Sequence, residues 1–201
     1  MSSLNPIGTP FIELPIIDST NNYAMGLVRE AMAQHGTAVF AHEQTSGKGQ
    51  RSRQWSSQKN QNIALSVVIE PATLNCGHLF LLSMTIANCV HDFLSRYVKN
   101  DLTIKWPNDI YWCDRKAAGI LIENLWQGQE WKFAIIGIGI NINQTEFGDL
   151  ASKAVSLKQV TGKDHDPFGL SMELAQLLEE SFQLLLSEPQ RLIAEYRDNL
   201  Y

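Results

Sequence analysis

The stretch from residue 102 to residue 142 constrains the fold most, because its β-forming segments follow one another with only short turns between them. Turn-forming residues stand at 106–109 and 127–129, where proline, asparagine and glycine interrupt the apolar pattern. Turns this short join antiparallel neighbours, whereas parallel strands need a connection of about a dozen residues or more. The run therefore favours a largely antiparallel sheet, with strands expected at 102–105, 110–113, 118–125 and 131–142.

The rest of the chain adds strands and helices to this sheet. Further strands are expected at 11–17, 37–41 and 62–70, and Pro15 makes the first of them an edge strand. Apolar residues at helical spacing predict helices at about 20–34, 77–97, 170–186 and 189–201. No linker or repeat divides the sequence. We therefore expect an α+β fold with a mixed, largely antiparallel sheet, helices packed on one face, and a single domain over residues 1–201.

Composition excludes several classes of protein. With 44% hydrophobic and 18% charged residues, the chain is too apolar for a disordered protein. A net charge of −5 argues against a general nucleic-acid binder, which carries a basic footprint. The N-terminus lacks the pattern of a signal peptide, and the longest apolar stretches are too short or too interrupted to span a bilayer. Three cysteines without C-x-x-C spacing are typical of reduced thiols, so we expect a cytoplasmic protein that binds no membrane.

A polar loop at 44–55 reverses the overall charge locally. It contains no acidic residue and three cations, Lys48, Arg51 and Arg53. Gly47 and Gly49 let its backbone bend closely around a ligand and present N–H groups to it. Such a loop could clamp a phosphate or a carboxylate from several sides. The alternative is a solvated, flexible loop, and the spacing of a P-loop is absent.

Two further groups of polar residues stand at strand ends. Lys105 ends a strand and is followed closely by Asn108 and Asp109, so one cation and two oxygen-bearing side chains could hold phosphate and magnesium together. An ordinary turn is the alternative. Lys116 precedes small residues that include Gly119, which would let a ligand approach closely. Here a charged hairpin turn is the alternative.

Two segments could contact uncharged groups. Glycines alternate with isoleucines over 136–143, so one face of this strand is nearly bare backbone. A planar ligand could lie on that face, with Asn141 or Asn143 reading its edge, or the strand could cross closely under a helix. Residues 19–21 supply neutral hydrogen-bonding side chains, with a helix cap as the alternative.

Together and in this order, the motifs resemble the catalytic domain of biotin protein ligases. The resemblance covers about residues 11 to 145 and implies the biotin–lipoate ligase fold, which is like that of class II aminoacyl-tRNA synthetases. The combination is specific, whereas any single motif is weak. It rests on Ser19-Thr20-Asn21, Gln44-Thr45-x-Gly47-Lys48-Gly49-x-x-x-Arg53-x-Trp55, Lys105-Trp106-Pro107-Asn108-Asp109, Arg115-Lys116-x-x-Gly119-Ile120-Leu121-x-Glu123 and Gly137-x-Gly139-Ile140-Asn141.

The resemblance implies a two-step reaction that uses biotin, ATP and Mg²⁺. The biotin carboxylate attacks the α-phosphate to give biotinyl-5′-AMP and pyrophosphate, and a lysine of a biotin carboxyl carrier protein domain then takes the biotinyl group. Lys116 is expected on the biotin carboxylate and the α-phosphate.

The same resemblance distributes the residues over three roles. Catalytic roles fall to Lys116, Arg51, Arg53, Lys105 and Asp109. Biotin contacts fall to Ser19, Thr20, Asn21, Gln44, Gly47, Lys48, Gly49, Gln50, Lys116 and Gly119. Nucleotide contacts fall to Trp55, Asn108, Gly139 and Asn141, and Mg²⁺ accompanies the ATP phosphates without an assigned protein ligand.

Two departures from the family pattern bear on function. The usual Gly-Arg-Gly-Arg of the basic loop is Gly-Lys-Gly-Gln at 47–50, so Lys48 loses the bidentate fork and Gln50 loses the charge. The small β-barrel domain that commonly follows the last helices is expected to be absent or truncated. There is also no room before Ser19 for a winged helix-turn-helix, so DNA binding is not expected.

Alternative functions remain at this stage. A lipoate or octanoate ligase shares the fold, but its apolar ligand tail would not need neutral polar residues such as Thr20 and Gln44. A non-catalytic module that binds biotin or biotinyl-AMP is the second alternative. Because ligases of this family often pair through a sheet edge, a homodimer is also open.

Overall fold

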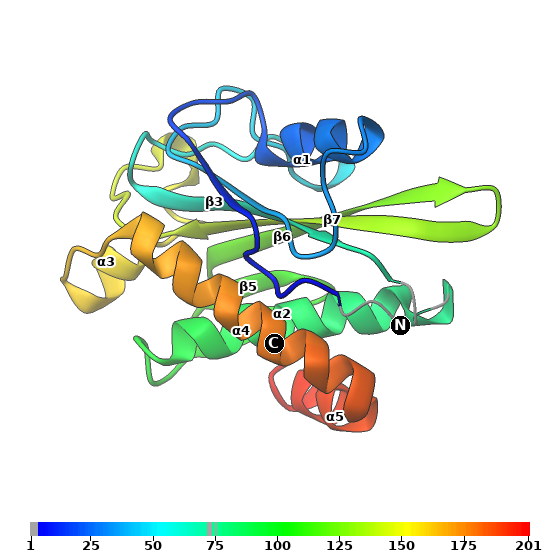
Figure 1. Ribbon diagram of the computed structural model, residues 1–201. Coiled ribbons are helices and arrows are strands. Elements are labelled where there is room, and N and C mark those ends of the chain that lie inside the picture. The colour runs from blue at the N-terminus through cyan, green and yellow to red at the C-terminus, as the bar shows by residue number, and fades with distance from the viewer. Residues whose placement is uncertain (1–3, 72–73, 75) are drawn as a thin grey trace.

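A seven-stranded sheet runs through the residues that the computed structural model describes, which are 4–71, 74 and 76–201 (Figure 1). Its order is β1-β2-β3-β7-β6-β5-β4, and every neighbouring pair is antiparallel except β1 and β2. The predicted mixed, largely antiparallel α+β fold is therefore confirmed. The strands are β1 (Phe11–Leu14), β2 (Ala38–Ala41), β3 (Asn62–Ile69), β4 (Leu102–Lys105), β5 (Asp109–Trp112), β6 (Arg115–Gln127) and β7 (Glu130–Asn141).

The hairpin run of the sequence forms the β7-β6-β5-β4 half of the sheet. β6 and β7 extend together beyond the other strands as a long ribbon (Figure 1). Gly128 in its turn has φ +60°, a left-handed conformation that favours glycine. β6 begins at Arg115, so the turn after β5 is tighter than the sequence predicted. β1 lies at an edge of the sheet, as Pro15 led us to expect.

Helices cover both faces of the sheet, so the prediction that they pack on one face is wrong for α1 (Thr20–Arg29). In Figure 1, α1 lies above the sheet, and α2 (Leu79–Ser95), α4 (Pro167–Ser187) and α5 (Pro189–Asp198) lie below it. The cause is the alternation of side chains along a strand. Val39 and Val68 pack with α1, whereas their chain neighbours Phe40 and Val67 belong to the larger core beneath.

Two helices differ from the sequence expectation. α1 ends at Arg29 rather than near residue 34, and Ala31 behind it adopts a left-handed φ of 55° that no helix continues through. α3 (Leu157–Thr161) was not predicted, because five residues are too few for a periodic signal. It begins with a capping box, in which the side chains of Ser156 and Gln159 each bond the other's backbone N–H.

Thiols and helix lengths bear on the expected cellular setting. Cys89 is buried in α2 and Cys113 is exposed, and both are free thiols, while the side chain of Cys76 lies outside the described residues. Within the described part of the chain, no helix has the length and apolar character needed to cross a bilayer.

Gly26 in α1 gives a first testable prediction. An added Cβ at this position would meet no atom within 4 Å, and the residue lies inside a helix, where glycine is costly. We expect Gly26→Ala to raise the free energy of unfolding by about 1 kcal/mol. Urea denaturation followed by circular dichroism measures this change, and an unchanged or lower midpoint would contradict it.

Candidate functional site

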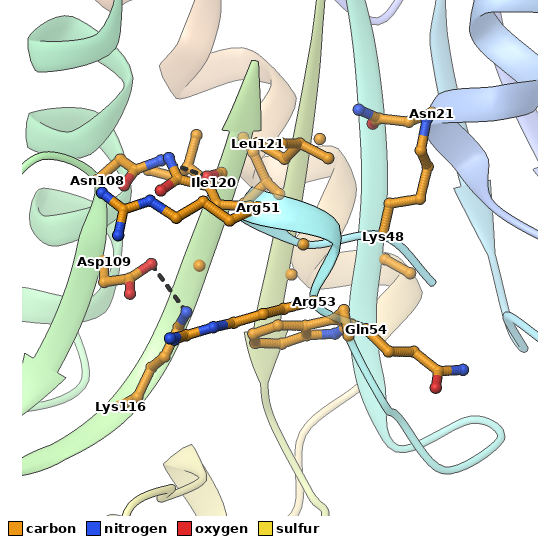
Figure 2. A pocket seen from close by; sticks show the side chains of 18 of the residues that line it. Asn21, Lys48, Arg51, Arg53, Gln54, Asn108, Asp109, Lys116, Ile120 and Leu121 are labelled. Atoms are coloured by element: carbon orange, nitrogen blue, oxygen red, sulfur yellow. Dashed lines mark hydrogen bonds and ion pairs between the residues drawn. The ribbon is translucent and has the colours of Figure 1, made fainter. Parts of the chain in front are cut away.

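A cavity of about 420 Å³ opens on the α1 side of the sheet. It lies between the start of α1, the basic loop, the turn after β4 and the strands β5, β6 and β7. Nearly all residues that the sequence singled out line it: Ser19, Thr20, Asn21, Gln44, Lys48, Gly49, Gln50, Arg51, Arg53, Trp55, Lys105, Asn108, Asp109, Lys116, Gly119 and Gly139. Figure 2 shows Asn21 and Lys48 at one end and Asn108, Asp109 and Lys116 at the other.

Two of the expected site residues do not line this cavity. Gly47 faces a neighbouring hollow under the basic loop, together with Lys48 and Glu123. Asn141 is buried at the end of β7, where its amide group donates to backbone carbonyls of Lys116 and Val155. The site therefore gathers motifs from all parts of the first two thirds of the chain, with these two exceptions.

The α1 end of the cavity is lined mainly by polar side chains without charge and is called the uncharged end, and the cation there, Lys48, is neutralised by its ion pair with Glu123. Gln44 Oε1 accepts hydrogen bonds from the backbone N–H and the hydroxyl of Thr20, at 2.9 and 3.1 Å. Ser66 Oγ on β3 lies 2.7 Å from Thr20 Oγ1 and 2.6 Å from Asn21 Oδ1, and all three side chains are buried. Ser19 occupies the N-cap position of α1 without a side-chain cap bond, so the cap does not use its hydroxyl. Such a set can pair the donors and acceptors of a neutral polar group.

Ser66 was missed by the sequence analysis. The available signal was a hydroxyl inside the otherwise apolar run of β3, at a position that is fully buried. A buried polar group needs a hydrogen-bond partner, so an isolated serine in such a strand predicts a polar site on one of its faces.

Glu123 on β6 ties the basic loop to the uncharged end. Its carboxylate accepts from Asn21 Nδ2 at 2.8 Å and from Lys48 Nζ at 2.7 Å. Asn21 lies against Gly137, where an added Cβ would approach its Cγ to 2.9 Å. The Glu123 carboxylate thus holds two side chains in place, the Asn21 amide on the cavity floor and the Lys48 ammonium group of the basic loop.

A second acidic residue besides Glu123, Asp18, lies at the base of the basic loop. Ser46 N donates to the carbonyl of Asp18 at 2.8 Å, and Asn22 Nδ2 donates to the Asp18 carboxylate at 2.6 Å. The bond from Asn22 is the main cause that lowers the pKa of Asp18, and Lys48 contributes in the same direction. Asp18 therefore stays ionised next to the cationic loop.

Cations dominate the opposite end. Lys116 Nζ pairs with Asp109 Oδ1 at 2.8 Å and stands 5.6 Å from the centre of the Trp55 ring. Arg51 and Arg53 extend from the loop toward this end, Arg51 toward Asn108 and Arg53 alongside Lys116 (Figure 2). Arg51 has φ 53°, a left-handed conformation that is uncommon outside glycine. The result is a concentration of positive charge suited to phosphate or carboxylate oxygens.

The turn between β4 and β5 is held from both sides. The Asn108 side chain is buried and donates to the carbonyl of Ile120 on β6. From the other side, the Tyr196 hydroxyl on α5 donates to the carbonyl of Pro107 at 2.8 Å. Lys105 also lines the cavity, with its Nζ 4.7 Å from the centre of the Tyr111 ring.

The bare face of β7 is covered by Trp55 as well as by Asn21. The indole lies on Gly139, where an added Cβ would approach its Cζ2 to 2.7 Å, and it reaches Gly119 as well. Its Nε1 is buried and has no hydrogen-bond partner among the described residues. An unpaired buried N–H is costly, and this one lies against Gly139 on β7 rather than open to the cavity.

No cluster of three His, Cys, Asp or Glu side chains that could hold a metal ion occurs within the described residues. Among the described residues that line the cavity, Asp109 is the one that presents a carboxylate at the cationic end. This donor set fits Mg²⁺, which binds through one or two carboxylates plus substrate phosphates and waters.

A family model and curated proteins match this chain. The family model described as the biotin/lipoate A/B protein ligase family matches residues 13–141. Among curated proteins, the bifunctional ligase/repressor BirA of Bacillus subtilis is 32% identical over 180 residues, which are 88% of this chain and 55% of that protein. The biotin–[acetyl-CoA-carboxylase] ligase of Paracoccus denitrificans is 34% identical over 159 residues, which are 75% of this chain and 63% of that protein. The chain thus spans little more than half the length of such relatives.

The fold of a solved structure matches that of this chain over most of its length. The biotin protein ligase from Aquifex aeolicus in complex with biotin and ATP superposes with a TM-score of 0.81 at 27% identity, covering 94% of this chain and 78% of that one.

Proposed function

The chain belongs to the biotin/lipoate A/B protein ligase family, and from this premise we propose that it activates biotin with ATP and transfers it to a carrier protein. The observation that carries the proposal is one cavity with an uncharged polar end and a cationic end. Biotin has a neutral ureido ring at one end and a carboxylate at the other. The relatives named as biotin ligases and the solved complex with biotin and ATP support the same substrates.

The first step joins two anions. A biotin carboxylate oxygen attacks the α-phosphorus of ATP, a bond from that oxygen to phosphorus forms, and pyrophosphate leaves. Lys116, Arg51 and Arg53 offset the repulsion between carboxylate and triphosphate. Asp109 and the ATP phosphates would hold Mg²⁺, which would neutralise phosphate charge when bound.

The second step transfers the acyl group. A lysine amine of the acceptor attacks the carbonyl carbon of biotinyl-5′-AMP, an amide bond forms, AMP leaves and the amine loses a proton. The basic loop, tied down by Lys48 and Glu123, keeps water away from the mixed anhydride.

The proposed residue roles are those that the family resemblance implies, and the lining of the cavity supports them. Biotin lies against Ser19, Thr20, Asn21, Gln44, Lys48, Gly49, Gln50 and Gly119, with its carboxylate at Lys116. The nucleotide lies near Trp55, Asn108 and Gly139, with Lys105 and Asp109 at its phosphates.

The wider setting is part of the same proposal. The acceptor is a biotin carboxyl carrier protein domain in the cytoplasm, nucleic acid is not a partner, and the chain acts as one catalytic domain. One sheet and one main core through the described residues support the last point. A homodimer through a sheet edge is tested by sedimentation of the purified chain.

The deciding experiment is exchange of labelled pyrophosphate into ATP, followed by mass spectrometry of a carrier domain. We expect exchange that depends on biotin and a mass increase on one lysine of the acceptor. Exchange that depends on lipoate or octanoate instead would assign the chain to the other branch of the family. Binding of biotinyl-AMP without transfer would make it a non-catalytic module.

Gln50 gives a prediction about retention of the intermediate. It lines the cavity in the loop and carries no charge where relatives of the family usually have arginine. A charge-assisted hydrogen bond to phosphate contributes about 1.5 kcal/mol or more, so Gln50→Arg should slow the release of biotinyl-AMP about tenfold. Stopped-flow displacement measures the release rate. Gln58→Arg adds the same charge at an exposed position outside the cavity, and an equal effect there would contradict the prediction.

A further inference from the structure

The backbone of Lys116 lies at a junction of the sheet. β6 and β5 change register beside it, since Tyr111 pairs with Lys116 and Ile110 pairs with Ala118. The pairing of β6 with β7 starts only at Ala118. At Lys116 the pairing of β6 with β7 has therefore stopped while its pairing with β5 continues, and a bulge of this kind re-aims a side chain.

A separate segment replaces β7 at this point. Lys116 N donates to the carbonyl of Lys153 at 2.8 Å, and Val155 N donates to the carbonyl of Lys116 at 3.0 Å. The segment is bridged to β6 as a short parallel partner, with Ala154 opposite Lys116. The backbone of Lys116 is thus held in part by residues 153–155, which belong to no regular strand.

Asn141 connects this segment to the sheet. It is the last residue of β7, it is 4% exposed, and its Nδ2 donates to the carbonyls of Lys116 and Val155 at 3.2 and 3.1 Å. The Asn141 amide group thus donates one hydrogen bond to β6 and one to the segment at residues 153–155. Since Asn141 does not line the cavity, these bonds are what the structure shows for its side chain.

We infer that Asn141 is a positioning residue that holds the backbone of Lys116, and through it the ammonium group, in register with Asp109. The inference rests on the proposed function only for the role of Lys116. Lys116 Nζ lies 2.8 Å from Asp109 Oδ1, and because the lysine stem is flexible, the backbone position is what fixes where the ammonium group starts from. The sequence also expected Asn141 at the nucleotide, and that expectation stays a prediction beside this inference.

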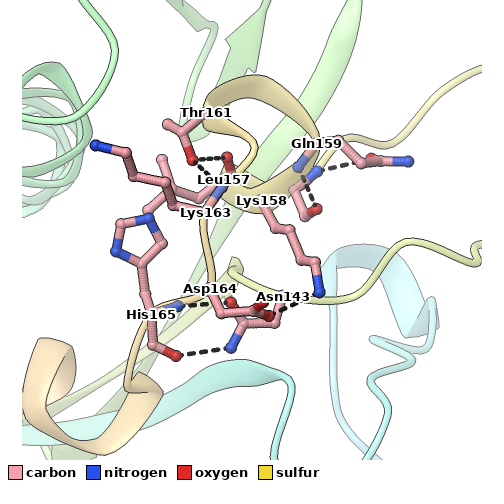
Figure 3. Close-up of polar contacts among 9 residues, drawn as sticks. Asn143, Leu157, Lys158, Gln159, Thr161, Lys163, Asp164 and His165 are labelled. Atoms are coloured by element: carbon pink, nitrogen blue, oxygen red, sulfur yellow. Dashed lines mark hydrogen bonds and ion pairs between the residues drawn. The ribbon is translucent and has the colours of Figure 1, made fainter.

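Asn143 is a matched control two residues further on. It is also a buried asparagine, and its amide makes two bonds with the backbone of His165, at 2.7 and 3.0 Å (Figure 3). It neither touches Lys116 nor lines the cavity. The substitution Asn143→Ala therefore removes similar bonds without reaching the junction.

The test is a double-mutant cycle on formation of biotinyl-AMP under single-turnover conditions, followed long enough to measure slow variants. In the wild-type background, Asn141→Ala should lower the rate constant by about 100-fold, because a misplaced group costs this much. In the Lys116→Ala background the same substitution should change it by less than about twofold, since a residue that acts through Lys116 is not additive with it. Equal factors in both backgrounds overturn the inference, and Asn143→Ala should have little effect in either.

A second measurement works without turnover. Lysines are labelled by reductive ¹³C-methylation, and the Lys116 signal is assigned by its loss in Lys116→Ala. Asn141→Ala, or the milder Asn141→Ser if the first variant does not fold, should shift that signal, whereas Asn143→Ala should not. An unmoved Lys116 signal also overturns the inference. If the wild-type chain forms no biotinyl-AMP, the proposed function fails while this measurement still decides on Asn141.

Discussion

Lys116→Ala is expected to lower the rate of biotinyl-AMP formation by about 100- to 1,000-fold, the range measured when one preorganised donor is removed from developing charge. Lys116 is the cation that pairs with Asp109 at the end of the cavity where carboxylate and α-phosphate would meet. Its loss leaves Arg51, Arg53 and Lys105 to offset the charge, so the rate should fall rather than vanish. Rapid quench with labelled ATP measures the step directly.

Two controls separate charge from folding in this experiment. Lys153→Ala removes an exposed lysine near the same junction whose side chain lies outside the cavity, and it should leave the rate within about twofold, as exposed substitutions usually do. Lys116→Arg keeps the charge in a different geometry and should recover only part of the rate. If Lys116→Ala matches the wild-type rate, the assignment of the catalytic lysine is wrong.

Much of the sheet could be predicted because its signals are local. Tight turns between 102 and 142 fixed the antiparallel half, and β4 has the predicted bounds. The placement of α1 was mispredicted, although β2 and β3 carried the evidence. They are buried at every position, and strands apolar on both sides need a layer on each face.

The site residues were predictable as residue types and not as contacts. Lysine, arginine and glycine at fixed spacing indicated an anion site, because their chemistry is intrinsic to the side chain. The Trp55 ring on Gly139 joins a loop to a strand far away in the sequence, and the bond from Asn141 to Lys116 depends on the bulge in β6. Such pairings are set by tertiary packing, which no local pattern encodes.

Gly137→Ala is expected to weaken biotin binding by about 10- to 100-fold, because displacing one or two buried hydrogen bonds costs this much. The added Cβ would collide with the Asn21 amide, which is held by Glu123 on one side and Ser66 on the other. The amide must shift, and the uncharged end of the cavity then loses its arrangement. Isothermal titration with biotin alone measures the loss, and binding of ATP should change much less.

The collision also predicts its own rescue. If Gly137→Ala acts by pushing Asn21 aside, the same substitution should have almost no further effect on biotin affinity once Asn21 is already alanine, since the two act through one contact. Gly26 lies in the same helix as Asn21, and an added Cβ there would meet no atom within 4 Å. Gly26→Ala is therefore the control for replacing a glycine by alanine, and it should leave the biotin affinity unchanged. If Gly137→Ala lowered the biotin affinity by the full factor in both backgrounds, Gly137 would act on the ligand itself. Residues of β7, rather than residues of α1, would then form the uncharged end of the cavity.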